Sequence, residues 1–151
     1  MSTNLPVCIM VICCMASCTD PRPEAEYESL IQQLGDEKLT LEERFKAQQK
    51  LARVRDDDSL IDLLVSHTED LRVFNAQAQR PQSGPDDNET YVQTVGDVCA
   101  AKLHAMLCEN QLSTYPTECI ENWRAWRARH ASKTVAELRA LISEWEKSRR
   151  H

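Results

Sequence analysis

The chain is poor in the residues that build β-rich folds. Its 151 residues include only 3 glycines and 6 prolines, and aromatic side chains make up 5%. Sandwiches and barrels need many tight turns and strands rich in aromatic residues, so this composition disfavours them. The length fits one domain, and 28% charged residues with a mean hydropathy of -0.51 suit a helical domain with a modest core.

The sequence also lacks the motifs of several common active sites. It has no glycine-rich phosphate loop, no GxSxG element and no CxxC or HExxH spacing. Cys99, His104 and Cys108 fall on one predicted helix, but Cys99 points about 140° away from His104, so they do not predict a metal site. The acidic run 56–58 lacks the spacing of a calcium-binding loop and is explained by helix capping. We therefore expect no metal ion or cofactor.

Net charge is -6 and is unevenly distributed. Residues 20–98 carry 18 acidic side chains against 9 basic ones, whereas residues 99–151 carry 6 against 9. The acidic balance argues against nucleic-acid binding, which needs a basic face. The opposite signs of the two halves predict that they attract each other or a partner of mixed charge.

The first 17 residues contain no charged side chain. The apolar run 7–15 is shorter than the roughly 20 residues of a membrane-spanning helix but fits the core of a signal peptide. It ends in Met15-Ala-Ser-Cys18, which resembles the lipobox of bacterial lipoproteins. The resemblance implies removal of residues 1–17, acylation of Cys18, and anchoring on the extracytoplasmic side of the bacterial envelope.

This organisation divides the chain into a signal peptide (1–17), a polar tether (18–23) and a helical domain (24–151). Two other interpretations of the leader remain open. An ordinary secretory signal would release a soluble secreted protein, and a start codon assigned too early would leave a cytosolic one.

Three of the 7 cysteines lie in the predicted helical domain, namely Cys99, Cys108 and Cys119. Cys108, predicted off the apolar face of its helix, and Cys119 flank a helix–helix link and form a candidate disulfide in an oxidising compartment. Otherwise the three are small buried side chains. As an alternative function, Cys108 or Cys119 with His104 would serve a thiol-dependent envelope enzyme or redox factor.

Apolar spacing and capping signals predict helices through most of the chain. The predicted helices cover residues 23–34, 41–54, 60–66, 94–112, 120–130 and 134–146. Capping boxes open three of them, at Thr40, Thr94 and Thr134, and Asp58 or Ser59 is expected to cap the third helix. The inward residues of the second helix are expected to be Leu41, Phe45, Leu51, Ala52 and Val54.

No convincing strand pair is predicted. A brief extended piece at 71–74 leads into a polar, turn-rich stretch, so residues 75–93 are expected to form a flexible loop. The segment from Arg72 to Glu89, with the adjoining helix ends, is the candidate contact surface.

Tryptophans 123, 126 and 145 have stripe spacing, which favours the core over an aromatic ligand pocket. Arginines 124, 127 and 129 are expected to be solvated helix surface, with contacts to lipid headgroups or an acidic partner as the alternative.

The stretch Ala47-x3-Leu51, an acidic turn, the apolar block 59–64 and Asp70-Leu-Arg-Val73 together resemble a HEAT-repeat helical hairpin. The block 94–107 is similar to the start of a degenerate second unit. Residues 122–126 and 133–138 are similar to the closing segments of HEAT-like domains in bacterial secreted proteins. The resemblance covers about residues 40–146 and implies a binding scaffold without catalytic residues.

We therefore expect an all-α fold of five to six helices, stacked as antiparallel HEAT-like hairpins with one long loop. The predicted function is a non-enzymatic protein-interaction module, anchored in the envelope membrane through acyl chains or secreted. Its protein partner is not identified by the sequence.

Overall fold

The computed structural model describes residues 23–79, 90–108 and 122–149, and within these ranges the chain is mostly helical with a small antiparallel sheet. The elements are α1 (Pro23–Leu34), α2 (Leu41–Arg53), α3 (Asp58–Ser66), β1 (Val73–Gln79), β2 (Thr90–Thr94), α4 (Val95–Leu107), α5 (Trp123–Arg129) and α6 (Val135–Arg149). The expected helical class is confirmed, with a β-hairpin added to it.

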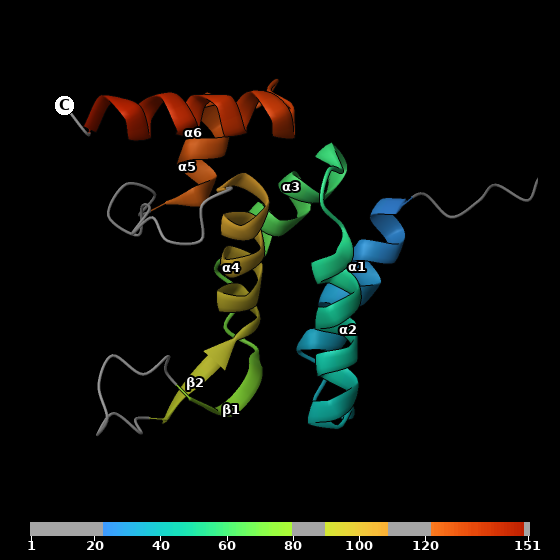
Figure 1. Ribbon diagram of the computed structural model, residues 1–151. Helices are drawn as coiled ribbons and strands as arrows, with labels where there is room; N and C mark the ends of the chain where they lie inside the picture. The colour runs from blue at the N-terminus through green and yellow to red at the C-terminus, as the bar shows by residue number, and fades with distance from the viewer. Residues whose placement is uncertain (1–22, 80–89, 109–121, 150–151) are drawn as a thin grey trace, which may run out of the picture.

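The helix α4 lies in the middle of the molecule (Figure 1). The pair α1 and α2 packs side by side as an antiparallel hairpin, and α3 contacts α1, α4 and α5. The β-hairpin lies at the N-terminal end of α4, whereas α6 crosses its C-terminal end. The two ends of α4 are therefore covered by different parts of the chain.

Capping explains where three of the helices begin. In each, a threonine side chain accepts the backbone N–H of the third helical residue, whose carboxylate accepts the threonine N–H in return. The pairs are Thr40–Glu43, Thr94–Asp97 and Thr134–Glu137. All three predicted capping boxes are confirmed, whereas the cap of α3 is Asp57, one residue before the prediction.

A continuous apolar core runs through the helices and the hairpin. Its largest fully buried side chains are Phe74, Ile31, Leu34, Leu51, Leu60, Ile61, Leu64, Leu103, Leu107, Leu138, Val95 and Cys99. One face of α4 belongs to this core, since Val98, Cys99, Leu103, Met106 and Leu107 are all buried.

The predicted inner face of α2 is partly wrong. Leu41, Phe45 and Ala52 are exposed, and the buried residues of this helix are Ala47 and Leu51. The reason is that α2 packs mainly on α1. Only a narrow stripe of α2, made of two residues one helical turn apart, therefore faces the core. Leu41 and Phe45 form a second apolar stripe on another face of the same helix.

The prediction of no strand pair is also wrong, because β1 and β2 form an antiparallel hairpin. The pairing runs from Val73 opposite Thr94 to Gln79 opposite Thr90, with two register shifts between. The hairpin occupies both ends of the stretch expected to be a flexible loop, and residues 80–89 lie outside the described ranges. Phe74, which is fully buried, anchors β1 to the core.

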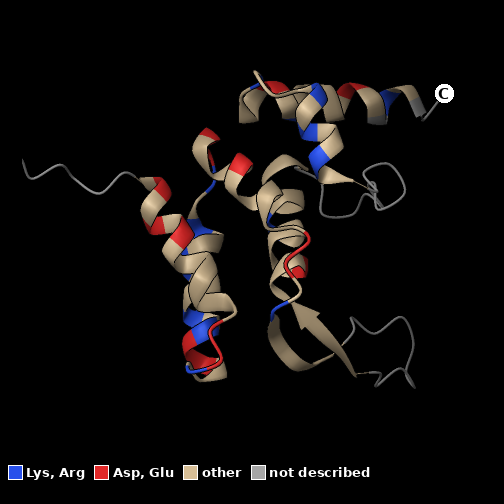
Figure 2. Cartoon of the chain, turned by 180° about the vertical axis from the view of Figure 1, so that it is seen from behind, with Lys and Arg blue, Asp and Glu red and all other residues tan. Residues whose placement is uncertain are grey.

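The two oppositely charged halves of the chain are joined by ion pairs, and Figure 2 shows how the acidic and basic positions are distributed over the helices. Acidic side chains of residues 56–69 meet basic side chains of α5 and α6: Arg127 with Asp62 at 2.6 Å, Arg124 with Glu69 at 3.2 Å, and Arg139 with Asp56 at 2.6 Å. Part of the opposite charge of the two halves is therefore neutralised by ion pairs within the molecule.

Arg127 corrects the expectation of a solvated arginine face. Its side chain is buried, and its Nη1 also donates to the backbone carbonyls of His130 and Lys133, both at 2.9 Å. The short helix α5 packs on α3, which turns position 127 inward. Trp123 and Trp126, 5.8 Å apart between ring centroids, are partly buried against the edge of the core, as is Trp145.

Candidate functional site: a groove between α2 and β1

A groove of about 550 Å³ lies between the first turns of α2 and strand β1. Its lining comes from Glu37, Leu41 and Arg44 on one side and from residues 73–77 on the other. It falls partly within the surface expected at residues 72–89. The volume is in the range of about 300–1,000 Å³ that is typical of binding sites.

Large apolar side chains are exposed around this groove. Leu41 is 42% exposed, Phe45 37% and Val73 39%. The Phe45 ring packs edge-to-face on buried Phe74, with 5.2 Å between centroids. Apolar side chains gathered around one groove are typical of an interaction site, because soluble monomers seldom expose large contiguous apolar patches.

Arg44 fixes the two walls of the groove relative to each other. Its Nη1 donates to the carbonyls of Val73 at 3.0 Å and Phe74 at 3.1 Å. Its Nε and Nη2 donate to the carbonyl of Leu39, at 3.3 and 3.2 Å. One guanidinium therefore joins the turn before α2 to the start of β1. In the described residues the sheet has two strands, so β1 has β2 on one edge and this groove on the other.

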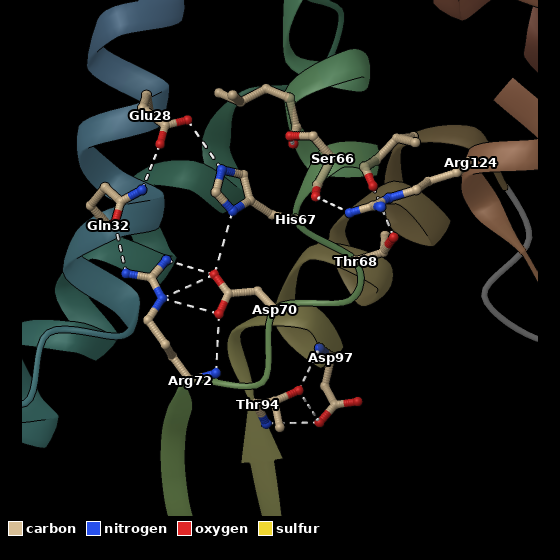
Figure 3. A network of polar contacts seen from close by, with 12 residues as sticks. Glu28, Gln32, Ser66, His67, Thr68, Asp70, Arg72, Thr94, Asp97 and Arg124 are labelled. Atoms are coloured by element: carbon tan, nitrogen blue, oxygen red, sulfur yellow. Dashed lines mark hydrogen bonds and ion pairs between the residues drawn. The ribbon is translucent and has the colours of Figure 1, made fainter. Parts of the chain in front are cut away.

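A polar network behind β1 sets the position of the strand (Figure 3). Arg72, the residue before β1, pairs with Asp70 through Nη2 at 2.6 Å and donates from Nη1 to Gln32 at 2.7 Å. Gln32 in turn donates to Glu28 at 2.6 Å. His67 lies between Glu28, at 3.2 Å, and Asp70, at 3.4 Å. The network thus connects α1, the segment after α3, and the start of β1.

The network favours the charged forms of Asp70, Glu28 and Arg72. The hydrogen bond from Arg72 holds the pKa of Asp70 below its usual value, and the bond from Gln32 does the same for Glu28. The Asp70 carboxylate correspondingly raises the pKa of Arg72. The nearby thiol of Cys99 is buried, and this burial raises its pKa to about 12. A protonated thiol is a poor nucleophile, so Cys99 is not expected to react in the folded protein.

Backbone contacts complete the positioning of β1. The N–H of Val95 donates to the Arg72 carbonyl at 2.8 Å, and the N–H of Gly96 donates to the Asp70 carbonyl at 2.9 Å. A Cβ at position 96 would lie 2.5 Å from the Thr68 carbonyl oxygen, so only glycine allows this close approach. The start of α4 and the start of β1 are therefore held together by their main chains.

The cysteines named by the sequence lie elsewhere. Cys108 is buried and follows α4 as its C-cap, with its N–H donating to the His104 carbonyl at 2.9 Å, so the prediction that it leaves the apolar face is wrong. The helix ends at Leu107, and the extended conformation of Cys108 turns its side chain inward. Cys18 and Cys119 lie outside the described residues, so acylation and the Cys108–Cys119 disulfide remain predictions.

The sequence interpretation missed Arg44 and the exposed role of Leu41 and Phe45. A signal for the last two was present, because they are four residues apart and do not share a helix face with Ala47 and Leu51. No local signal distinguishes Arg44 from other surface arginines, since the bonds that join it to β1 go to backbone carbonyls about 30 residues away.

Comparison with protein-family models, with curated proteins and with solved structures finds no match for this chain. Among residues 23–79, 90–108 and 122–149, no helix is both long enough and apolar enough to cross a bilayer. Over the same ranges, no group of three or more His, Cys, Asp or Glu side chains is placed to hold a metal ion. The groove is thus defined by its own geometry and chemistry.

Proposed function

We propose that this protein is a non-enzymatic protein-interaction module of the bacterial envelope, with HEAT-like helical hairpins as its scaffold. It is held at the membrane through acylated Cys18 or, alternatively, secreted. The observation that supports a binding role is the groove between α2 and β1, with its exposed apolar rim and the outer edge of β1 along one wall.

The chemistry of the groove favours an extended peptide as the bound segment. Arg44 already occupies the carbonyls of Val73 and Phe74. The strand edge beyond them offers main-chain groups to a peptide in β-conformation, and neighbouring pockets select alternate side chains. Leu41 and Val73 supply apolar contacts on opposite walls, and Arg44 keeps those walls together. We expect the partner segment to carry apolar residues at alternate positions.

Selection of displayed random peptides on the immobilised full chain tests this binding mode. Leu41→Glu should weaken binding of the selected peptides by about ten-fold or more, because a carboxylate would then have to be buried in the apolar contact. Position 41 is the first residue of α2, where an acidic side chain suits the helix dipole, so folding should be kept.

Leu71→Glu is the matched control, because Leu71 is 82% exposed and does not line the groove. It should leave peptide binding unchanged. Equal binding by the Leu41→Glu and unmodified chains would rule out the groove as the contact surface.

The proposed location depends on the leader, and intact mass tests it separately. Protein expressed from its own N-terminus and extracted from membranes should have the mass of a chain that begins at Cys18 and carries acyl chains. Cys18→Ala should abolish both the processing and the membrane association. A soluble chain that still begins at Met1 would contradict the envelope assignment without affecting the test of the groove.

A further inference from the structure

A second hollow lies at the opposite end of the molecule from the groove, where the C-terminal ends of α2 and α4 meet α6. Its volume is about 480 Å³, and three basic side chains line it together with one acidic side chain. The basic residues are Arg55, Lys102 and Arg139, and the acidic one is Asp56. An excess of positive charge would attract an anionic ligand. Whether the excess persists depends on how many of the three cations are neutralised by groups of the protein.

Arg139 is the most fully engaged of the three. Its Nη1 pairs with Asp56 at 2.6 Å and its Nε donates to the carbonyl of Met106 at 2.6 Å. This pair brings no net charge to the hollow. Arg139 serves instead to hold α6 against the end of α4.

Lys102 keeps one donor beyond those that the protein uses. It is 9% exposed, and its ammonium donates to the carbonyls of Ala52 and Val54 at the end of α2. An ammonium has three N–H donors, so one remains beyond these two bonds. Burial lowers the pKa of Lys102, and the charge of Arg55 lowers it further, so the two cations are close enough to repel.

Arg55 is uncommitted within the part of the chain that the structure describes. Its side chain is exposed and has no hydrogen-bond or ion-pair partner there, and only its backbone carbonyl is used, by Arg139. The carbonyl ends of α2 and α4 each contribute roughly half a negative charge. Two uncompensated cations against these helix ends leave the hollow with a net positive charge of about one.

An apolar slot continues from the hollow between α2 and α4. Its volume is about 190 Å³, and it shares Ala52, Lys102 and Ala105 with the hollow. Ala52 on α2 faces Ala101 and Ala105 on α4, and all three are exposed. Small side chains on both helices leave a space that larger residues would fill.

We infer that the hollow and the slot together bind a small amphipathic anion. Its carboxylate or phosphate group lies between Arg55 and Lys102, and its short apolar tail lies between α2 and α4. The combined space suits a small molecule, and the charge on one side and the alanines on the other match the two ends of such a ligand. This site is independent of the peptide groove.

Titration of the full isotope-labelled chain with octanoate, followed by NMR, tests the inference. The expected result is saturable shifts of Ala101, Lys102 and Ala105, with acetate and octanol each binding at least ten-fold more weakly than octanoate. Vesicles containing phosphatidylglycerol form a second arm, which separates a free amphiphile from a lipid headgroup. Binding to vesicles with none to monomeric octanoate would overturn the proposal.

Two matched pairs of variants locate the site. Arg55→Gln should weaken octanoate binding about two- to five-fold, as expected for a partly solvated charge pair, whereas Arg53→Gln on the same helix end should not. Ala101→Met should fill the slot and reduce binding more than ten-fold, whereas Ala136→Met, on an exposed face of α6, should not. Unchanged affinity in Ala101→Met, or equal losses in both members of a pair, would contradict the assignment.

Discussion

At the scale of single residues, Gly96 has no room for a side chain. It is the second residue of α4, and a Cβ there would meet the Thr68 carbonyl oxygen at 2.5 Å. At an open helical position, alanine in place of glycine stabilises a protein by about 0.4–1 kcal/mol. Gly96→Ala should instead lower the free energy of unfolding by about 1–3 kcal/mol, because the junction of α4 with the segment before β1 must open. Urea denaturation gives the sign directly, and a stabilised variant would show that the contact is not tight.

Cys99 should be inert in the folded protein. With a pKa of about 12, only about one thiol in ten thousand is ionised at pH 8. Alkylation by iodoacetamide, located by mass spectrometry, should therefore be slow at Cys99 in the native chain and fast in guanidinium. Rapid native labelling of Cys99 would show that this part of the core opens readily.

Asp70 makes stability depend on pH in one direction. Its folded-state pKa lies below the ordinary value of 3.8, mainly because Arg72 hydrogen-bonds to its carboxylate. A depressed pKa stabilises the protein above the unfolded-state value, and this contribution is lost as the pH falls through the folded-state value. The free energy of unfolding should thus decline below about pH 4, and the decline should be shallower in Asp70→Asn. Parallel declines in the two proteins would assign the acid sensitivity to other carboxylates.

At the scale of elements, α5 and the turn into α6 depend on Arg127. Its guanidinium binds Asp62 and the carbonyls of His130 and Lys133, so removing it leaves several acceptors without their donor. Arg127→Met should cost about 1–3 kcal/mol in the free energy of unfolding, and Asp62→Asn less than about 1 kcal/mol because Asp62 is largely exposed. Tryptophan fluorescence during urea unfolding reports on both, since Trp123 and Trp126 lie on α5. Equal losses of unfolding free energy in the two variants would show that Arg127 stabilises the protein through its ion pair with Asp62 rather than through its bonds to the carbonyls.

The helices were predictable from the sequence to a much greater extent than the hairpin. Three capping boxes and the apolar stripe of α4 are local signals, and the capping boxes place the starts of α2, α4 and α6 correctly to within a residue. The hairpin had a weaker signal, since Phe74, Ala76 and Ala78 alternate with polar residues in β1. This signal is weak because alanine carries little apolar area. The strand is held in place by the burial of Phe74 and by the contacts of Arg44 and Arg72. These interactions depend on the tertiary fold and not on the sequence of the strand.

At the scale of the whole molecule, the uneven charge of the sequence predicted an attraction between its halves but not its geometry. The pairing of α3 with α5 depends on which helix faces meet, and the buried position of Arg127 follows from that meeting. The groove was foreseen only as a region, because its two walls come from segments about 30 residues apart. The groove and the hollow each lie between elements of secondary structure. The residue pattern within one segment therefore does not predict either of them.

The direction of α1 determines how far the groove would stand from an anchored surface. The helix begins at Pro23, next to the segment expected to act as a tether, and runs toward the turn that opens the groove (Figure 1). Its 12 residues span about 18 Å. In a chain anchored through Cys18, α1 would place this length of helix between the anchored end of the domain and the groove, so partners in the aqueous compartment would have access to the groove.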